Sequence, residues 1–213
     1  MTDAAPTDDI DLYFYFDPAC PWTWLTSRWL VDAAPRRGKA VTWRSLSLFV
    51  LNEGDIPEQY RLRVTAGRDA HRLFAALDEA GRNDLIGAVY AAIGARVHDG
   101  GEELTAAVVR EAAAAAGAGA WLDAADDPAW DAAVELSTKR AVELAGPDVG
   151  SPVLAHGTPR VGMFGPIVSP GPRGEAGARL LDLALEAAEV AGFFELKRGR
   201  SGGPALPAPP PAP

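Results

Sequence analysis

Cysteine is almost absent from this chain. Cys20 is the only cysteine among 213 residues, so no intramolecular disulfide can form, and export to an oxidising compartment would bring no structural benefit. Histidine is also scarce, and His71, His98 and His156 are scattered without the spacing of metal ligands. With one thiol and no histidine pair, we expect no metal site.

Further absences narrow the class of protein. No apolar run approaches the length of a membrane span, and the acidic segment 1–9 lacks the apolar core of a signal peptide. The formal net charge of −9 argues against binding to nucleic acid or to an anionic membrane surface. No glycine-rich phosphate loop follows a strand, so we expect no tightly bound dinucleotide. These features predict a cytoplasmic protein without a nucleic-acid or membrane partner.

The order of the predicted elements indicates the fold class. A strand over 11–16 leads into a helix over 21–34, and the β-branched and aromatic stretch 40–48 predicts a second strand. A block with helical periodicity follows, and then a strand pair between 152 and 164 and a long helix that starts near Gly174. This order predicts an α/β thioredoxin-like fold with a mixed central sheet and an inserted all-helical domain.

The domain boundaries follow from the same pattern. Proline recurs so often after Gly203 that neither a helix nor a central strand can form there. We therefore predict a flexible N-terminus (1–10), a thioredoxin-like domain (11–52 with 148–200), an inserted helical domain (53–147) and a disordered proline-rich tail (201–213).

Cys20 lies where the first predicted strand passes into the first predicted helix. Pro21 suits the first helical position, which makes Cys20 the N-cap residue. The unpaired N–H groups and the positive end of the dipole at a helix start favour an anion. Such a thiol can have a pKa of about 3.5–7.5 instead of about 8.5. The sequence therefore predicts a lowered pKa and a nucleophilic thiolate.

Thr23 occupies the position at which a Cys-x-x-Cys motif would carry its second thiol. A threonine hydroxyl there could donate a hydrogen bond to the thiolate and lower its pKa, or it could simply fill space in the helix. Both interpretations remain open at this point. In either case the chain has no internal thiol that could resolve a mixed disulfide at Cys20.

Other conspicuous residues have structural interpretations. Trp24 and Trp29 are predicted to lie in the core, whereas Trp22, beside the thiol, could form a wall of a pocket for an aromatic substrate. His98 ends a predicted helix, where a cation interacts favourably with the dipole, and we interpret it as such a cation.

The segment 15–29, Tyr-Phe-Asp-Pro-Ala-Cys-Pro-Trp-Thr-Trp-Leu-Thr-Ser-Arg-Trp, resembles the DsbA-like branch of the thioredoxin superfamily. Within that branch the chain is most similar to the mycothiol-dependent nitroreductases, which carry cysteine where this chain has Thr23. Shorter matching pieces are spread in order over most of the chain: 51–53, 56–60, 150–152, 164–166, 172–175 and 193–198. The resemblance implies a thioredoxin fold with a helical lid and a low-molecular-weight thiol, mycothiol, as co-substrate.

The resemblance also implies roles for particular residues. It makes Ser151 and Pro152 the cis-proline loop that faces the active cysteine, although a trans proline at the start of a strand is the alternative. It places Asn52 and Tyr60 in the substrate pocket, where the residues alone would suggest an ordinary cap and a half-buried tyrosine. The predicted catalytic residues are Cys20 and Thr23, and the predicted thiol- and substrate-binding residues are Pro21, Trp22, Asn52, Tyr60, Ser151 and Pro152.

Three functions are compatible with this sequence. The first is a monothiol, nitroreductase-like oxidoreductase that reduces a small electrophilic or disulfide substrate and is recycled by a second thiol or a mycoredoxin-like protein. The second is a thiol transferase or isomerase, related to kappa-class glutathione transferases and hydroxychromene carboxylate isomerases, because such reactions need no resolving cysteine. The third is a non-catalytic binding protein. A homodimer is compatible with each.

Overall fold

The computed structural model describes residues 12–52, 55–158 and 160–208. Their centre is a four-stranded mixed sheet in the order β2-β1-β3-β4. Strand β1 (Leu12–Phe16) pairs in parallel with β2 (Val41–Ser45) and antiparallel with β3 (Val153–His156). Strand β4 (Val161–Phe164) pairs antiparallel with β3 and completes the sheet. This topology confirms the predicted thioredoxin-like fold class.

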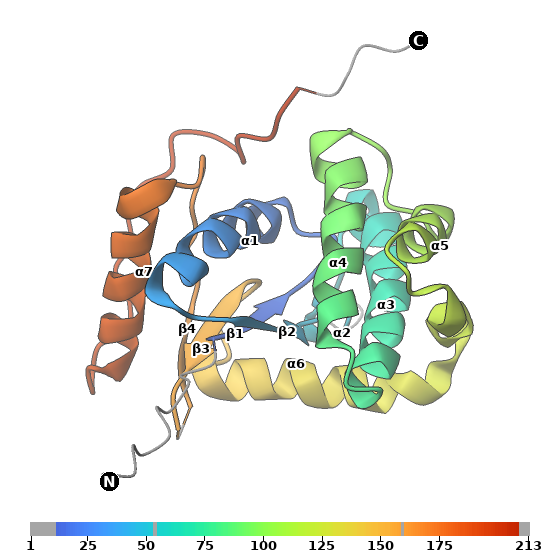
Figure 1. Ribbon diagram of the computed structural model, residues 1–213, viewed down its shortest axis with the longest axis horizontal. Helices are drawn as coiled ribbons and strands as arrows, with labels where there is room; N and C mark the ends of the chain where they lie inside the picture. The colour runs from blue at the N-terminus through green and yellow to red at the C-terminus, as the bar shows by residue number, and fades with distance from the viewer. Residues whose placement is uncertain (1–11, 53–54, 159, 209–213) are drawn as a thin grey trace, which may run out of the picture.

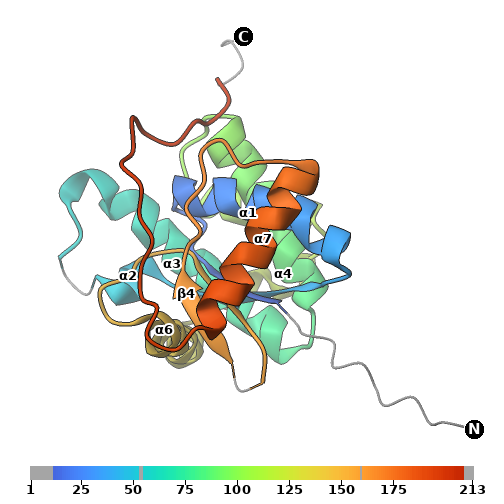
Figure 2. The same ribbon diagram turned by 90° about the vertical axis from the view of Figure 1, so that its left-hand side faces the viewer.

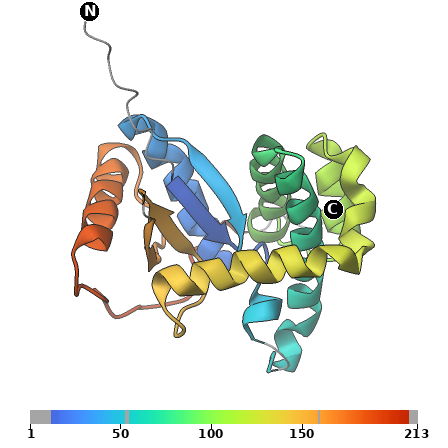
Figure 3. The ribbon, with the colours of Figure 1, turned by 90° about the horizontal axis from the view of Figure 1, so that it is seen from below.

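Helices cover both faces of the sheet (Figure 1). Helix α1 (Pro21–Ala33), continued by the 3₁₀ turn η1 (Ala34–Arg37), lies on one face with α7 (Gly174–Glu189). Helix α6 (Asp131–Ala145) crosses the other face, as Figure 3 shows from below. The sheet is therefore enclosed, and the start of α1 lies at one end of it.

All elements between β2 and β3 in the described residues are helical. In chain order they are α2 (Leu48–Leu51), α3 (Glu58–Glu79), α4 (Asn83–Gly94), the π-helical turn η2 (Ala95–Asp99), α5 (Ala106–Ala115), the 3₁₀ turns η3 (Gly119–Asp126) and η4 (Pro128–Trp130), and α6.

The second strand is shorter than the sequence pattern suggests. The predicted range was 40–48, whereas β2 ends at Ser45. The reason is local, because the Ser47 side chain accepts a hydrogen bond from the Val50 N–H and caps α2 instead of extending the strand. This early end brings the first turn of α2 next to the loop that holds Cys20.

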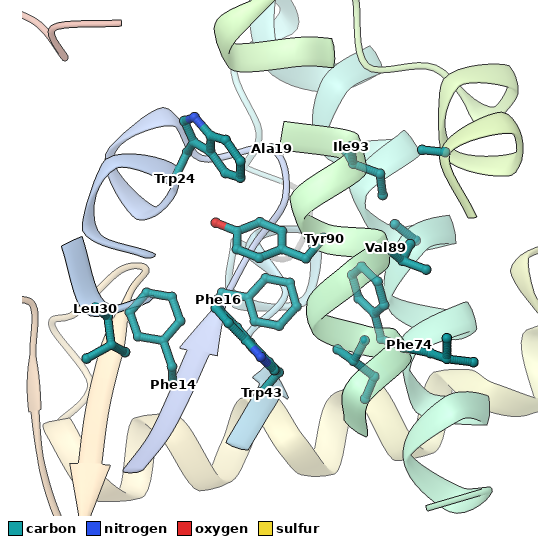
Figure 4. Packing of buried hydrophobic residues seen from close by; sticks show 14 of the residues in the cluster. Phe14, Phe16, Ala19, Trp24, Leu30, Trp43, Phe74, Val89, Tyr90 and Ile93 are labelled. Atoms are coloured by element: carbon teal, nitrogen blue, oxygen red, sulfur yellow. The ribbon is translucent and has the colours of Figure 1, made fainter. Parts of the chain in front are cut away.

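An aromatic cluster joins the sheet to the helical segment (Figure 4). The ring of Phe16 on β1 lies 4.2 Å from that of Tyr90 on α4, 5.2 Å from Phe74 on α3 and 5.7 Å from Trp43 on β2, measured between ring centroids. Trp24 of α1 meets the same Tyr90 ring edge-on at 5.7 Å. Because these side chains are buried, the thioredoxin-like part and the helical segment share one core.

The predicted core positions on α1 are confirmed. Trp24 is 2% exposed and Trp29 is fully buried. The indole N–H of Trp29 donates to the Gly177 carbonyl at 3.0 Å, which ties α1 to α7. The burial of both rings and this hydrogen bond fix the axis of α1, and therefore the direction in which its N-terminus points.

Beyond α7 the described chain has no further helix or strand and turns back beside that helix (Figure 2). The Ala205 N–H donates to Ser169 Oγ at 2.8 Å, and Leu206 packs against the main core. The guanidinium of Arg200 lies 4.7 Å from the centre of the Trp22 ring. This path brings part of the C-terminal tail to the start of α1.

Disorder of the tail over 201–213 and the proposed domain boundaries remain predictions. The predicted flexible segment 1–10 and residues 209–213 of the tail lie outside the described residues. In the part of the chain that the structure describes, no helix combines the length and apolarity needed to cross a membrane.

Candidate functional site

Cys20 is the N-cap residue of α1, as predicted. Its backbone is extended (φ −90°, ψ 114°), and Pro21 begins the helix. The Cys20 N–H donates to the Asp17 carbonyl at 3.1 Å, and its own carbonyl accepts from the Trp24 N–H at 3.1 Å. Its side chain makes no capping bond. The sulfur therefore remains available at the helix start.

The thiol faces the loop that precedes β3. Cys20 Sγ lies 3.8 Å from the Ser151 carbonyl oxygen, within the range of a weak S–H hydrogen bond. The Ser151–Pro152 peptide bond is cis, which confirms the predicted geometry of this loop. The strand–helix junction and the cis-proline loop, 131 residues apart in the chain, thus meet at the sulfur.

The predicted lowering of the thiol pKa is wrong for this structure. Burial raises the pKa of the Cys20 thiol, and the negative charge of Asp17 raises it further. Hydrogen bonds that the Thr23 side chain and the backbone N–H groups of Thr23 and Trp22 can offer to the thiolate lower it, but not enough to compensate for the loss of solvent. The helix start therefore favours the thiolate less than its sequence position suggests.

Thr23 links α1 to the cis-proline loop. Its side chain is fully buried, and its hydroxyl donates to Ser151 Oγ at 2.8 Å. Ser151 Oγ also accepts the Asp17 N–H at 3.0 Å. Thr23 is therefore more than a space-filling residue, because it joins the two segments that meet at Cys20.

A polar cluster that sequence analysis missed lies beneath the thiol loop. Asp17 is fully buried, and its Oδ1 accepts the Ala19 N–H at 2.7 Å. Its Oδ2 accepts the Leu48 N–H at 2.7 Å and lies 3.2 Å from His71 Nε2. His71 Nδ1 lies 2.9 Å from Ser45 Oγ. His71 is 54 residues from Asp17 in the chain, so no local sequence pattern could have paired them.

His98 supports the loop from the other side. Its Nε2 lies 2.9 Å from the Pro18 carbonyl oxygen and donates to it, and its ring stacks on Trp24 at 5.9 Å. Burial lowers the pKa of His98 to about 4, so the imidazole is neutral at physiological pH. The interpretation of His98 as a helix-end cation is therefore wrong, because a buried imidazole loses the hydration that a charge requires.

The structure brings some predicted binding residues to the sulfur and not others. Trp22 is half-buried beside Cys20 and lies under Arg200. Asn52 ends α2, and its Nδ2 donates to the Leu48 carbonyl at 2.7 Å. Tyr60, 49% exposed in the first turn of α3, lines a separate cavity of about 310 Å³. Among the described residues, neither Asn52 nor Tyr60 has a hydrogen bond to Cys20, and their roles remain predictions.

Metal binding has no evident site in the part of the chain that the structure describes. Over residues 12–52, 55–158 and 160–208, no group of three or more histidine, cysteine, aspartate and glutamate side chains is placed to hold an ion.

Comparison with known proteins agrees with this geometry. An uncharacterized protein of Mycobacterium tuberculosis, Rv2286c, is 31% identical over 192 residues, which cover 88% of this chain and 81% of that protein. The cytosolic disulfide reductase DsbM of Pseudomonas aeruginosa, solved with GSH, superimposes with a TM-score of 0.56 at 18% identity and covers 81% of this chain and 98% of its own.

A probable DsbA oxidoreductase of Streptomyces coelicolor, SCO1869, superimposes with a TM-score of 0.54 at 20% identity, over 94% of this chain and all of its own. At these identities the two structures establish the DsbA-like fold alone. The sequence profile described as "Rv2466c-like: Mycothiol-dependent nitroreductase Rv2466c" matches residues 19–198. With a half-buried Cys20 at the start of α1, facing a cis-proline loop, the chain has a DsbA-like fold and belongs to the Rv2466c-like family.

Proposed function

We propose that this protein is a monothiol oxidoreductase that exchanges disulfides between a low-molecular-weight thiol, mycothiol, and a small substrate. The observation that carries the proposal is the position of Cys20, whose sulfur lies at the start of α1 and 3.8 Å from the carbonyl oxygen before cis-Pro152. A disulfide formed at this sulfur would lie against the cis-proline loop. The family to which the chain belongs supports mycothiol as the co-substrate.

The exchange requires two steps at one sulfur. The Cys20 thiolate attacks a substrate disulfide, forms a new S–S bond and releases one substrate thiolate. A second thiolate from solution then attacks the mixed disulfide and releases Cys20, so the incoming thiol is oxidised and the first substrate thiol is the reduced product. Thr23 cannot perform the second step, because its hydroxyl has no sulfur chemistry.

The raised pKa of Cys20 fits a thiol that is activated in the complex. At neutral pH the free protein holds this group mainly as the thiol, which limits wasteful oxidation. The first-turn N–H groups of Trp22 and Thr23 lower the thiol pKa in the free protein, and they remain in place to stabilise the thiolate once substrate is bound. A cytoplasmic location and recycling by a mycoredoxin-like protein belong to the same proposal, because thiols are kept reduced in that compartment.

Intact mass spectrometry tests the proposal directly. Incubation with mycothiol disulfide is expected to add a single mycothiol to the wild-type protein and none to Cys20→Ser. Added mycothiol should then remove the adduct and yield mycothiol disulfide. A Cys20 that resists both this adduct and alkylation by iodoacetamide in the folded protein would refute the function.

A thiol transferase or isomerase is the second candidate, favoured by one observation. A buried Thr23, bonded to Ser151, stands where a resolving thiol would be, and transfer or isomerisation needs no such thiol. Product analysis separates the two, since exchange converts one equivalent of the incoming thiol into a disulfide and releases one substrate thiol per turnover, whereas transfer yields a conjugate and isomerisation leaves the thiol unchanged.

A further inference from the structure

The carboxylate of Asp17 lies beneath the thiol loop without access to water. A buried carboxylate is costly unless hydrogen bonds replace its hydration. Here the N–H groups of Ala19 and Leu48 each donate at 2.7 Å, and His71 Nε2 lies at 3.2 Å. Three elements thus hold one side chain: the loop before Cys20, the start of α2 and the middle of α3.

Helix α3 approaches this carboxylate very closely. A Cβ atom added to Gly67, one turn before His71, would lie only 3.3 Å from Asp17 Oδ1 and 3.5 Å from Ala19 Cβ. Glycine therefore allows α3 to pack against the loop at this point. The contact positions His71, which is fully buried, with little freedom to move relative to the thiol loop.

Ser45 completes the arrangement. With the His71 proton on Nε2, directed at Asp17, the lone pair on Nδ1 accepts the Ser45 hydroxyl proton at 2.9 Å. A serine hydroxyl rotates freely and can donate or accept. Every polar atom of the imidazole is thereby satisfied, and its N–H is directed at the carboxylate.

Asp17 is the charged group of this cluster that acts on the thiol. The titratable groups around it are Cys20 on α1, His71 on α3, Tyr90 on α4 and His98 on η2, and α2 contributes only a backbone N–H. Burial raises the pKa of Tyr90 and lowers that of His98 to about 4, so neither carries charge while a thiol titrates. The thiolate of Cys20 therefore forms near the negative charge of Asp17, which opposes it. The hydrogen-bond donors to the Asp17 carboxylate shield part of that charge.

We propose that His71 is a positioning residue for Cys20: it holds the Asp17 carboxylate in place beneath the thiol loop and thereby limits the negative charge that the forming thiolate meets. The proposal rests on the proposed function, in which Cys20 reacts as a thiolate. It assigns to the helical segment between β2 and β3 a part in setting thiol reactivity, in addition to covering the site.

The test measures the rate of Cys20 alkylation by iodoacetamide against pH in the folded protein. His71→Leu removes the donor and is expected to raise the midpoint by about one pH unit, which slows alkylation at pH 7 about tenfold. His71→Gln keeps an N–H for Asp17 and should remain within about twofold of the wild-type rate. Asp17→Asn removes the charge and should shift the midpoint in the opposite direction.

The double variant decides between positioning and mere support of the fold. In the Asp17→Asn background, His71→Leu is expected to have no further effect on the midpoint, because the two residues act through one contact. His156→Leu is the matched control: His156 is also buried, but its Nε2 bonds the Leu185 carbonyl on α7. It should lower stability without moving the midpoint.

If Asp17→Asn fails to fold, Ser45→Ala replaces it, since loss of the hydroxyl that holds Nδ1 should shift the midpoint in the same direction as His71→Leu, with about a twofold slower rate at pH 7. The proposal is overturned if His71→Leu leaves the midpoint in place, or if its effect persists undiminished with Asp17→Asn. In both cases a reactive wild-type Cys20 would leave the proposed function intact. A wild-type Cys20 that is not alkylated at any pH would overturn both the role of His71 and the proposed function.

Discussion

The starts of α1 and α5 differ in how their caps use the first-turn N–H groups. At α5 the Thr105 side chain accepts the Val108 N–H at 3.2 Å, as helix caps ordinarily do. At α1 the cap is Cys20, and its sulfur bonds no N–H of its helix. The α5 cap contributes stability, whereas the α1 cap leaves its donors free for a thiolate. The start of α1 therefore lacks the stability of a side-chain cap, and a reactive thiol occupies the cap position instead.

Cys20→Ser tests this comparison with the largest expected effect. It should abolish adduct formation with mycothiol disulfide, because no other thiol exists in the chain. The serine oxygen should also accept a first-turn N–H and raise the free energy of unfolding by about 1 kcal/mol. Mass spectrometry and urea denaturation measure the two effects.

Thr105→Ala is the matched counterpart at α5. It should lower the free energy of unfolding by about 1 kcal/mol and leave alkylation of Cys20 unchanged. If Cys20→Ser were as destabilising as Thr105→Ala, the two helix starts would not differ in the way we describe.

Thr23→Cys should change the fate of the adduct. The new thiol would lie in the first turn beside Cys20, at the spacing of a Cys-x-x-Cys motif, and could resolve a mixed disulfide from within the chain. We expect the mycothiol adduct to become transient and an internal disulfide to accumulate, detected as a loss of two hydrogens by mass. Thr23→Val, with no hydroxyl for Ser151, is the control and should keep a stable adduct. A lasting adduct in Thr23→Cys would contradict the prediction.

Acidic pH should destabilise the loop before α1, which His98 supports, more than it destabilises the start of α5. The pKa of His98 is about 4 in the folded chain, against an ordinary value of 6.5. Between these two pH values the unfolded chain binds a proton at His98 that the folded chain does not bind. The stability that comes from keeping this imidazole neutral is therefore complete above about pH 6.5 and is lost as the pH falls towards about 4. Urea denaturation at pH 7 and 4.5 should show a loss of about 2–3 kcal/mol in wild type that His98→Gln lacks. Equal losses in both proteins would exclude His98 as the source.

The smallest expected effect concerns the charge beside the α1 cap. Arg200 places a guanidinium over Trp22, next to Cys20. Arg200→Ala should lower the ratio of alkylation by anionic iodoacetate to that by neutral iodoacetamide about twofold at low salt, and high salt should remove the difference. Arg198→Ala, in the same tail, is the control. An equal fall in both variants would point to net charge instead of this contact.

Local patterns predicted the parts of this site that depend on neighbouring residues. The strand before Cys20, the helix after it, Pro21 at the first helical position and the core tryptophans follow from residue type and spacing alone. The end of β2 was missed because the cap at Ser47 competes with strand pairing, and a hydrophobic pattern does not show which prevails.

The electrostatics of the site depend on contacts that cross the chain. The direction of the Cys20 pKa shift depends on burial, which arises only when α1 packs against the cis-proline loop. His98 and His71 acquire their partners, Pro18 and Asp17, from loops 80 and 54 residues away. Such contacts require the tertiary structure, whereas a cap or an amphipathic helix does not.

The threonine at position 23 has a kinetic consequence for the proposed exchange cycle. A second cysteine in the same turn would resolve a mixed disulfide at a rate that does not depend on concentration, because the attacking group is tethered. With Thr23 buried and bonded to Ser151, the resolving step becomes second order. Turnover then rises and falls with the free thiol concentration, and the lifetime of the adduct on Cys20 reports how well the surrounding thiol pool is supplied.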